Sequence, residues 1–407
     1  MKKYKVYPVN SFFHYQRARK RKRIMAIVAI LAGIIGSIIF VVTSNLGEKL
    51  AFRLPFFNKA GKYIESVYLG ESSINYHLFD HMERVRGIYI PSSKIHEYER
   101  YIKLAKESGI NAFVIDIKND QGCLTFNTAN QTAIEAGAVL EKPPITDMNH
   151  MMNRLYEEGI YPIARVVAFK DNVIPKKYPE RAIKSLNGQV YETSTKDTWL
   201  DPYNQKNWEY LLEISDEAVA LGFKEIQFDY IRFHESMSSD KVILDEQLSK
   251  REIITAFTKY ACEHLQEKGA FVSADVFGAV ILSKLDADIV GQDFEKMSQY
   301  LDYICPMVYP SHYAEGTFGI AYPHLDAYGI ILKTMHLGQD IISEETSSNH
   351  QATIRPWLQD FTLKSLKPYL KYGPEHIKAQ IKATYDAGLD EWLFWNAAGN
   401  YTTDGFK

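Results

Sequence analysis

The sequence predicts an α/β fold of the (β/α)8 TIM barrel class, preceded by a single N-terminal transmembrane helix. From residue 85 onward, short runs of β-branched and aromatic residues alternate with amphipathic stretches, a pattern typical of parallel strands joined by helices. Eight such runs lie between residues 86 and 395, which favours a closed barrel over an open sheet. No GxGxxG motif follows the first run, and this disfavours a dinucleotide-binding fold.

The predicted strands and helices alternate along the whole of this region. Strands are expected at residues 86–90, 112–117, 162–167, 225–229, 271–276, 303–308, 354–359 and 391–395. Helices are expected at residues 94–107, 147–158, 205–221, 245–268, 293–301 and 375–387. Several of these helices are followed by a glycine suited to a helix C-terminus, shortly before the next strand: Gly109, Gly159, Gly222, Gly269 and Gly388.

The N-terminal region carries a membrane signal. Residues 24–43 contain no charged side chain, and a helix of that length spans about 30 Å, the thickness of the hydrocarbon layer. The basic run RARKRKR directly precedes it, and basic flanks stay on the cytoplasmic side. We therefore expect a protein of the cell membrane, crossing it once, with the C-terminal domain extracellular. A cleaved signal peptide is the alternative, disfavoured by the length of the apolar run and a poor cleavage site.

These signals divide the chain into four predicted parts. They are a basic cytoplasmic arm at 1–23, a transmembrane anchor at 24–43, an extracellular stalk at 44–84 and the barrel at 85–407. The lipid bilayer is thus one expected partner, whereas nothing in the sequence indicates the oligomeric state.

Charge and cysteine usage exclude several classes of function. Residues 1–23 hold nine of the 47 Lys and Arg residues and no acidic residue, so the rest of the chain has 38 basic against 50 acidic residues. Such an acidic body is a poor binder of nucleic acid. The three cysteines show no CxxC spacing, which argues against a structural zinc site and a disulfide framework. P-loop, HExxH and GxSxG motifs are also missing, and no cofactor is expected.

Carboxylates at the ends of predicted strands indicate the chemistry, because TIM barrels carry their active sites at the carboxyl ends of the strands. Asp229 and Asp275 end neighbouring strands, which run about 4.8 Å apart, and this suits the paired carboxyls of a retaining glycosidase. Asp229 is favoured as the nucleophile and Asp275 as the acid/base. Two alternatives stay open: an ion pair of Asp229 with Arg165 or Arg232, and a loop cap by Asp275 before Gly278.

Further polar and aromatic residues near the same strand ends are candidates for substrate binding. Flat aromatic faces suit the apolar faces of sugar rings, and polar side chains suit their hydroxyls. The predicted substrate-binding set is Asp116, Arg165, Gln227, Tyr309, His312, Trp357, Asp360, Trp392 and Asn396. The same carboxylates could instead hold Mg²⁺ or Ca²⁺, although Arg165 and Lys118 would compete for them; no metal site is therefore predicted.

Ten sequence blocks in order resemble a bacterial family of proposed glycoside hydrolases that was long catalogued as a domain of unknown function. The blocks run from about Val85 to Tyr401: VRGIYIP, NAFVIDIKNDQG, ARVVAFKD, WLDPYN, EIQFDYIRF, SADVFG, GQDFEKM, DYICPMVYPSHY, RPWLQDF and DEWLFWNAAGNY. The resemblance implies a (β/α)8 barrel and hydrolysis of glycosidic bonds.

The acidic residues are also similar in layout to the α-amylase clan, whose pattern falls on Asp229, Asp275 and Asp360. Two positions depart from that clan: Asp275 stands where the clan has Glu, and Gln227 stands where it has Arg. The carboxylate spacing and an α-glucan substrate therefore stay open.

We predict a membrane-anchored extracellular glycoside hydrolase that acts on a cell-wall or surface polysaccharide. Two alternatives from other classes remain: a non-catalytic carbohydrate-binding or wall-organising barrel, and a metal-dependent hydrolase using the same carboxylates.

Overall fold

A closed barrel of parallel strands forms the centre of the computed structural model, which describes residues 84–245, 247–344 and 350–407. All the described residues belong to one unit of the chain, residues 72–407. Their strands are β1 (Arg86–Ile90), β2 (Ala112–Lys118), β3 (Tyr161–Val167), β4 (Glu225–Asp229), β5 (Phe271–Phe277), β6 (Tyr303–Met307), β7 (Thr353–Ile354), β8 (Trp357–Gln359) and β9 (Trp392–Trp395). The sheet order is β5-β4-β3-β2-β1-β9-β8-β6-β7, and pairing of β5 with β6 closes it.

Strands β7 and β8 share the seventh position of the barrel, since both pair with β6. Arg355 and Pro356 separate them, and a proline cannot donate a backbone hydrogen bond to a sheet ladder. The nine strands therefore fill eight positions, which confirms the predicted (β/α)8 barrel. The sequence pattern had indicated one uninterrupted strand over 354–359.

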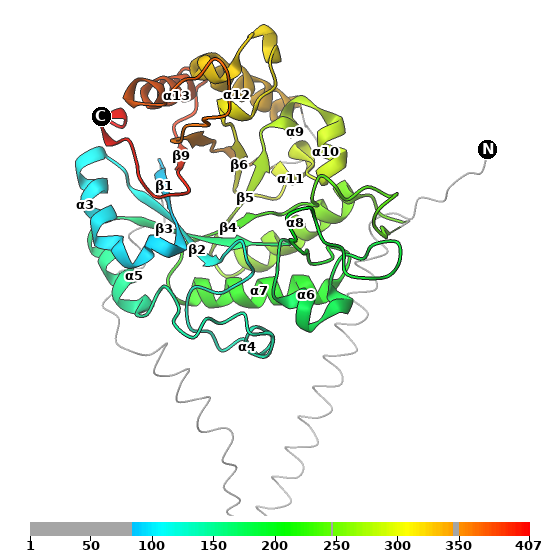
Figure 1. Ribbon diagram of the computed structural model, residues 1–407. Helices are drawn as coiled ribbons and strands as arrows, with labels where there is room; N and C mark the ends of the chain where they lie inside the picture. Colours follow the sequence, from blue (N-terminus) through cyan, green and yellow to red (C-terminus); the bar gives the residue numbers. More distant parts are fainter. Residues whose placement is uncertain (1–83, 246, 345–349) are drawn as a thin grey trace, which may run out of the picture. The chain divides into compact units, whose positions relative to one another are not determined.

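Helices surround the strands (Figure 1). They are α3 (Tyr98–Ser108), α4 (Gln131–Ala136), α5 (Met148–Glu157), α6 (Ile174–Lys177), α7 (Gln205–Ala220), α8 (Lys250–Gln266), α9 (Ala279–Leu282), α10 (Lys284–Val290), α11 (Phe294–Ser298), α12 (Ala327–Glu344) and α13 (Pro374–Asp386). Short 3-10 turns include η2 (Ser92–Glu97) before α3 and η4 (Pro310–His312) after β6.

Several boundaries differ from those predicted. Helix α8 begins at Lys250 instead of residue 245, because Ser249 accepts a hydrogen bond from the backbone of Glu252 and caps the helix there. Helix α12 was not among the predicted helices; two internal glycines, Gly329 and Gly338, weaken its helical signal. Strands β1 and β4 have the predicted bounds.

The predicted basic arm (1–23), the anchor (24–43) and all but the last residue of the stalk (44–84) lie outside the described residues. Within the part that the structure does describe, no helix combines the length and apolar character that a membrane crossing requires.

Gly278 directly follows β5 and packs against the end of β6 and the chain after it. Replacing it therefore probes how closely the backbone packs at this end of the barrel. A Cβ at this position would lie 2.7 Å from the backbone oxygen of Met307 and 2.4 Å from the hydroxyl of Tyr313. We expect Gly278→Ala to lower the free energy of unfolding by about 1–3 kcal/mol, because the backbone must shift. Denaturant unfolding measures this change.

Gly338→Ala is the matched control. A Cβ at Gly338 would meet its neighbours at 3.4 Å or more, which is ordinary van der Waals contact. Alanine also favours a helix interior over glycine, so this variant should be neutral or slightly stabilising. Equal stability of the Gly278→Ala variant and the native protein would contradict the expected close packing after β5.

Candidate active site

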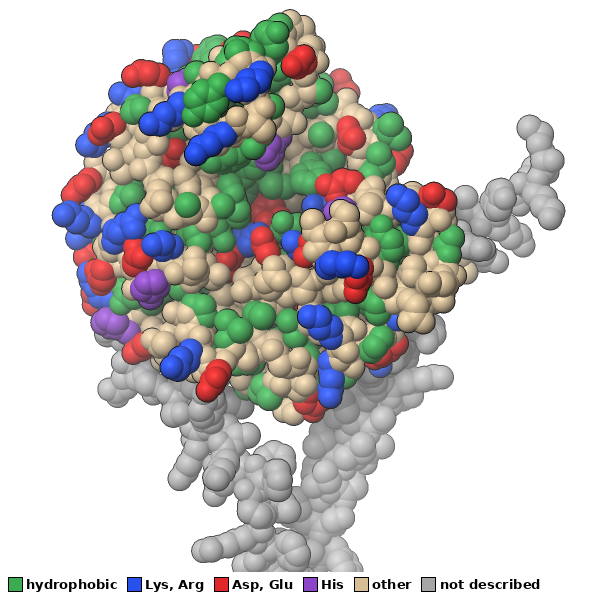
Figure 2. All heavy atoms as spheres, in the orientation of Figure 1, with side chains coloured by type: hydrophobic (Ala, Val, Ile, Leu, Met, Phe, Trp, Pro, Cys, Tyr) green, Lys and Arg blue, Asp and Glu red, His purple; other side chains and the backbone are tan. Residues whose placement is uncertain are grey.

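Four charged residues meet where β2, β3, β4 and β5 end. Asp116 on β2 is in register with Arg165 on β3, and Asp229 on β4 is in register with Val167, two residues beyond Arg165. Phe228 pairs with Ala274, so Asp229 and Asp275 occupy the next neighbouring positions on β4 and β5. Figure 2 shows a hollow in this view of the molecule, with acidic and basic side chains at its floor.

Arg165 is the centre of the charged group. Its guanidinium donates to Asp116 (Nη1 to Oδ1, 2.6 Å), to Asp120 (Nη2 to Oδ1, 2.7 Å) and to Asp229 (Nε to Oδ2, 2.9 Å; Nη2 to Oδ2, 2.5 Å). Burial by itself lowers the pKa of Arg165, but the surrounding carboxylates outweigh it and raise this pKa. The arginine is therefore a permanent buried cation that holds three carboxylates together.

Asp229 is ion-paired with Arg165, which is one of the two partners that the sequence left open for it. Its Oδ1 atom also accepts a hydrogen bond from the backbone N–H of Tyr230 at 2.6 Å. Tyr230 has a φ of 48°, a left-handed conformation that a bulky residue rarely adopts. Strained backbone of this kind persists where the surroundings enforce it, often next to functional side chains.

Asp275 has a different environment from its neighbour. Burial, followed by repulsion from the Asp229 carboxylate, raises the pKa of Asp275 well above its ordinary value. The indole Nε1–H of Trp357 donates to Oδ1 of Asp275 at 2.6 Å. In the described structure this indole, and not a cap on the loop at Gly278, holds the carboxyl in place.

Three residues at the site were not among the predicted site residues: Tyr89, Trp395 and Asp120. Tyr89 on β1 donates its hydroxyl hydrogen to Asp116 at 2.7 Å and stacks on Trp395 with ring centroids 4.1 Å apart. Asp120 lies beyond the end of β2 and is the most exposed of the three carboxylates on Arg165, with 40 % of its side chain accessible. Burial raises the pKa of Asp120, but Arg165 outweighs this and lowers it. Asp120 could have been predicted as a site residue because it lies just after β2, the strand that carries Asp116.

Aromatic side chains from β8, from β9 and from the segments after β6 and β8 lie near Arg165 and its carboxylates. Trp357 contacts Trp395 edge-on at 5.7 Å, and the ring of Trp395 lies 5.4 Å from the Arg165 guanidinium. Tyr309 contacts the rings of His312 and Phe361 at 5.3 and 5.4 Å. Burial lowers the pKa of His312, so this imidazole is neutral at pH 7. The structure thus places Tyr309 against His312, and the Trp357 indole against Asp275.

Other predicted binding residues are already occupied by protein partners. Gln227 is fully buried two residues before Asp229, and its Nε2 lies 3.5 Å from the sulfur of Cys305, a weak donor contact deeper in the barrel. Asp360 accepts hydrogen bonds from the backbone N–H and the hydroxyl of Thr402. Asn396 donates to the backbone oxygen of Asp360 at 2.5 Å. Asp360 and Asn396 therefore fasten the C-terminal segment to the barrel.

Trp392 does not lie at the predicted site. It is the first residue of β9, whereas Trp395 is the last, so the strand carries these two side chains toward opposite ends of the barrel. The Trp392 indole donates to the Tyr385 hydroxyl at 3.1 Å and stacks on Phe406. It lines a cavity of about 470 Å³ with Arg86, the first residue of β1.

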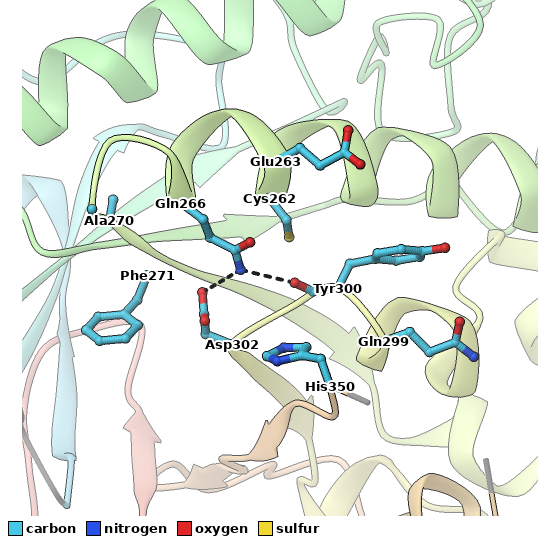
Figure 3. A pocket seen from close by; sticks show the side chains of 10 residues that line it. Cys262, Glu263, Gln266, Ala270, Phe271, Gln299, Tyr300, Asp302 and His350 are labelled. Carbon is cyan, nitrogen blue, oxygen red and sulfur yellow. Dashed lines mark hydrogen bonds between the residues drawn. The ribbon is translucent and has the colours of Figure 1, made fainter. Parts of the chain in front are cut away.

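A second cavity, of about 480 Å³, also lies at the amino-terminal ends of strands. Its lining includes Phe271, which begins β5, and Asp302, which precedes β6. Figure 3 shows Gln266 pointing across it, and the amide nitrogen donates to Asp302 and to the backbone oxygen of Tyr300 at 3.1 and 3.2 Å. Gln266 and Asp302 thus satisfy each other here, at the end of the barrel away from the paired carboxyls.

A metal ion is the alternative partner for the carboxylates around Arg165. In the described ranges, no three His, Cys, Asp or Glu side chains are arranged to hold a metal ion. The place that a cation would take among Asp116, Asp120 and Asp229 is filled by the Arg165 guanidinium. The residues present therefore do not fit a metal centre at these carboxylates.

A parallel eight-position barrel with carboxyl groups at the ends of neighbouring strands has the architecture found in many glycoside hydrolases. Residues 87–401 match the model of the family described as "Putative glycosyl hydrolase domain", and the chain belongs to this family. It is a glycoside hydrolase by family, and a glycan substrate follows from that class.

Solved structures with similar folds include three that show the range of similarity. The glycoside hydrolase domain of PgaB (BpsB) from Bordetella bronchiseptica is 14 % identical, with a TM-score of 0.54, covering 77 % of this chain and 94 % of that one. A hypothetical protein from Ruminiclostridium thermocellum is 38 % identical (TM-score 0.42; 46 % and 97 % covered). The spore cortex-lytic enzyme SleL of Bacillus megaterium is 13 % identical (TM-score 0.46; 80 % and 73 % covered). No curated protein matches the chain.

Proposed function

We propose that this protein is a membrane-anchored extracellular glycoside hydrolase that cleaves a cell-wall or surface polysaccharide, with Asp229 as nucleophile and Asp275 as acid/base. One observation carries the proposal: neighbouring carboxyls at the ends of β4 and β5 have opposite environments. Asp229 is ion-paired with Arg165, whereas burial raises the pKa of Asp275 so that it keeps its proton. Two carboxyls in different protonation states are what acid-assisted glycoside cleavage requires.

The reaction follows from these two environments. The Asp229 carboxylate attacks the anomeric carbon while Asp275 gives its proton to the departing oxygen, and the glycosidic bond breaks as the Asp229 ester forms. Asp275, now ionised, removes a proton from water, which attacks the same carbon and releases Asp229. The half-buried ring of Trp395, which stacks on Tyr89, offers an apolar surface for the sugar.

The predicted anchor at 24–43 supports the location of the reaction. An anchored extracellular barrel would meet polysaccharides of the cell wall or surface, because these lie next to the membrane that holds it.

Trapping the ester tests this proposal. The enzyme is incubated with 2-deoxy-2-fluoro glycosides that carry a good leaving group, and its peptides are analysed by mass spectrometry. We expect a covalent sugar on the peptide that contains Asp229, together with reducing-end release from bacterial cell-wall polysaccharide. An adduct on another carboxylate would overturn the assignment of the nucleophile. Inversion at the anomeric carbon would overturn the covalent mechanism.

A non-catalytic carbohydrate-binding barrel is favoured by a separate observation. Asp229 and Asp275 are only 7 % and 2 % exposed, and Asp229 is already ion-paired. A binding barrel would show glycan affinity without adduct formation or release of reducing ends, so the same two measurements separate the two functions.

Replacing Trp357 with Phe tests the role of Asp275 through the pH dependence. The indole hydrogen bond favours the ionised form of Asp275, so losing it raises the pKa of this carboxyl further. An acid that must be protonated then stays active to higher pH. We expect the basic limb of the kcat/KM profile to move up by about 1 pH unit, the size expected for a hydrogen bond to a charged group.

Trp208→Phe is the control for this variant. Trp208 also donates its indole N–H to a buried acceptor, the backbone oxygen of Pro202, but it lies on α7. This variant should leave the pH profile in place. A basic limb that stays fixed or moves down in Trp357→Phe would contradict the acid role of Asp275.

A further inference from the structure

Arg232 is a second buried arginine, and it lies three residues after Asp229. Its side chain is 7 % exposed, and its guanidinium carbon lies 4.3 Å from the ring centroid of Phe277, 5.1 Å from that of Tyr230 and 5.2 Å from that of Trp199. Phe277 is the last residue of β5, two positions after Asp275. The arginine is therefore held against aromatic rings beside the ends of both carboxyl-bearing strands.

The charge of Arg232 is poorly compensated, in contrast to that of Arg165. Among the described residues, Glu235 is the one carboxylate within ion-pair distance, at 3.5 Å, and its side chain is 53 % exposed. Glu235 also lies 3.3 Å from His234. Burial lowers the pKa of Arg232, and the attraction of Glu235 does not offset this effect. An anion brought to this guanidinium would gain the interaction that the protein itself does not supply.

Arg232 also has donors to offer. Its Nη1 atom donates to the backbone oxygen of Phe233 at 2.9 Å. No acceptor in the described part of the chain is bonded to Nε or Nη2, and neither atom is fully enclosed. Two parallel N–H groups of one guanidinium match the two oxygens of a carboxylate or phosphate.

Lys170 is a second cation near Arg232, and both contact the ring of Tyr230, the residue that follows Asp229. The Lys170 ammonium lies 5.2 Å from the ring centroid of Tyr230, the same ring that Arg232 contacts. Lys170 is 3.4 Å from Asp197 and is 14 % exposed. Tyr230 directly follows Asp229 in the chain, and its own backbone has the left-handed conformation described above.

We propose that Arg232, assisted by Lys170, forms a subsite for an oxyanion substituent on a sugar unit next to the cleaved bond, so that the substrate is an acidic polysaccharide. This inference rests on the proposed hydrolase function. The shared chemistry is a carboxylate or phosphate group on the glycan, which a planar guanidinium binds bidentately beside the aromatic rings that receive the sugar.

The native enzyme is tested first on three forms of one polymer. Bacterial cell-wall polysaccharide is used untreated, after reduction of its carboxyls through carbodiimide activation, and after removal of its phosphodiester polymers with hydrofluoric acid. Binding is followed by co-sedimentation and cleavage by reducing ends. We expect one treatment to lower kcat/KM and affinity by about 10–100-fold, the range for hydrogen bonds to charged groups, and that treatment identifies the anion. Equal action on all three forms would overturn the subsite.

The variants assign the preference to Arg232. Arg232→Gln should abolish the discrimination between charged and uncharged polymer. Arg232→Lys should retain part of it, because the ammonium keeps the positive charge but cannot form two parallel hydrogen bonds to the anion. Lys382→Gln removes one positive charge from an exposed position of α13 and should keep the full preference. Full discrimination by a folded Arg232→Gln protein would refute the role of this arginine.

Two further measurements distinguish a misfolded variant from a variant that has lost the anion subsite. Circular dichroism reports whether Arg232→Gln folds. If it does not, competition in the native protein decides, since oligomers carrying the anion identified above should displace the wall polymer and neutral oligomers should not. Preferential binding of charged polymer without any cleavage would refute the hydrolase function and retain the anion subsite. Cleavage without preference would refute the subsite and retain the hydrolase.

Discussion

Asp229→Asn is expected to lower kcat by about 10⁴-fold while the protein keeps its fold and much of its affinity for glycan. An amide has nearly the shape of a carboxylate but cannot attack the anomeric carbon. The Arg165 guanidinium stays paired with Asp116 and Asp120 in this variant, so Arg165 loses one of its three counter-ions and keeps two. The fold therefore has a physical reason to survive.

Reducing-end release and glycan co-sedimentation, measured side by side, check this result. Asp390→Asn is the matched control, because Asp390 is an exposed aspartate near Arg84 whose side chain is 62 % accessible. The control should retain native turnover. If Asp229→Asn hydrolyses glycan at the native rate, Asp229 is not the nucleophile. Unchanged binding by a native protein without turnover would indicate a carbohydrate-binding barrel.

The fold could be predicted because its signals are local and repeated. Strands such as β1 and β4 are short apolar runs with clear ends, and the topology of a parallel barrel follows once eight such runs alternate with helices. The same topology places Asp229 beside Asp275, since both end neighbouring strands. The neighbouring positions of Asp229 and Asp275 could therefore be predicted without knowing any side-chain conformation.

Partner choice among the side chains could not be predicted. The sequence allowed Asp229 to pair with Arg165 or with Arg232, and the distinction depends on which long side chain reaches across the strand ends. Trp392 and Trp395 are three residues apart on one short strand, but they serve opposite ends of the barrel. Asp360 is satisfied by Thr402 because the C-terminal segment folds back, a contact that no local pattern encodes.

Arg165→Met is expected to have the largest effect on stability. Removing this guanidinium leaves Asp116 and Asp229 as buried carboxylates without a counter-ion, while Asp120 retains partial access to water. Breaking a buried pair in this way costs about 3–5 kcal/mol of unfolding free energy. Activity should fall with it, because Asp229 loses the guanidinium whose two hydrogen bonds hold its carboxylate in place.

The pH dependence of this loss has a definite sign. Burial raises the pKa of Asp116 in the native protein and the Arg165 cation opposes this effect, so removing Arg165 raises the pKa of Asp116 further above the unfolded value of about 3.9. The penalty of the variant is then largest near pH 7 and shrinks as the pH falls toward 4, where both states bind the proton. Urea unfolding at a series of pH values should show the native and variant stabilities converging toward low pH.

Arg154→Met separates burial from the number of ion pairs. Arg154 on α5 also holds three carboxylates, those of Glu99, Glu157 and Glu158, but it lies at the surface. Exposed pairs contribute little because water already solvates both charges, so this variant should lose far less stability and show no convergence with pH. Equal losses in the two variants would mean that the number of ion pairs, and not the buried position of Arg165, stabilises the barrel.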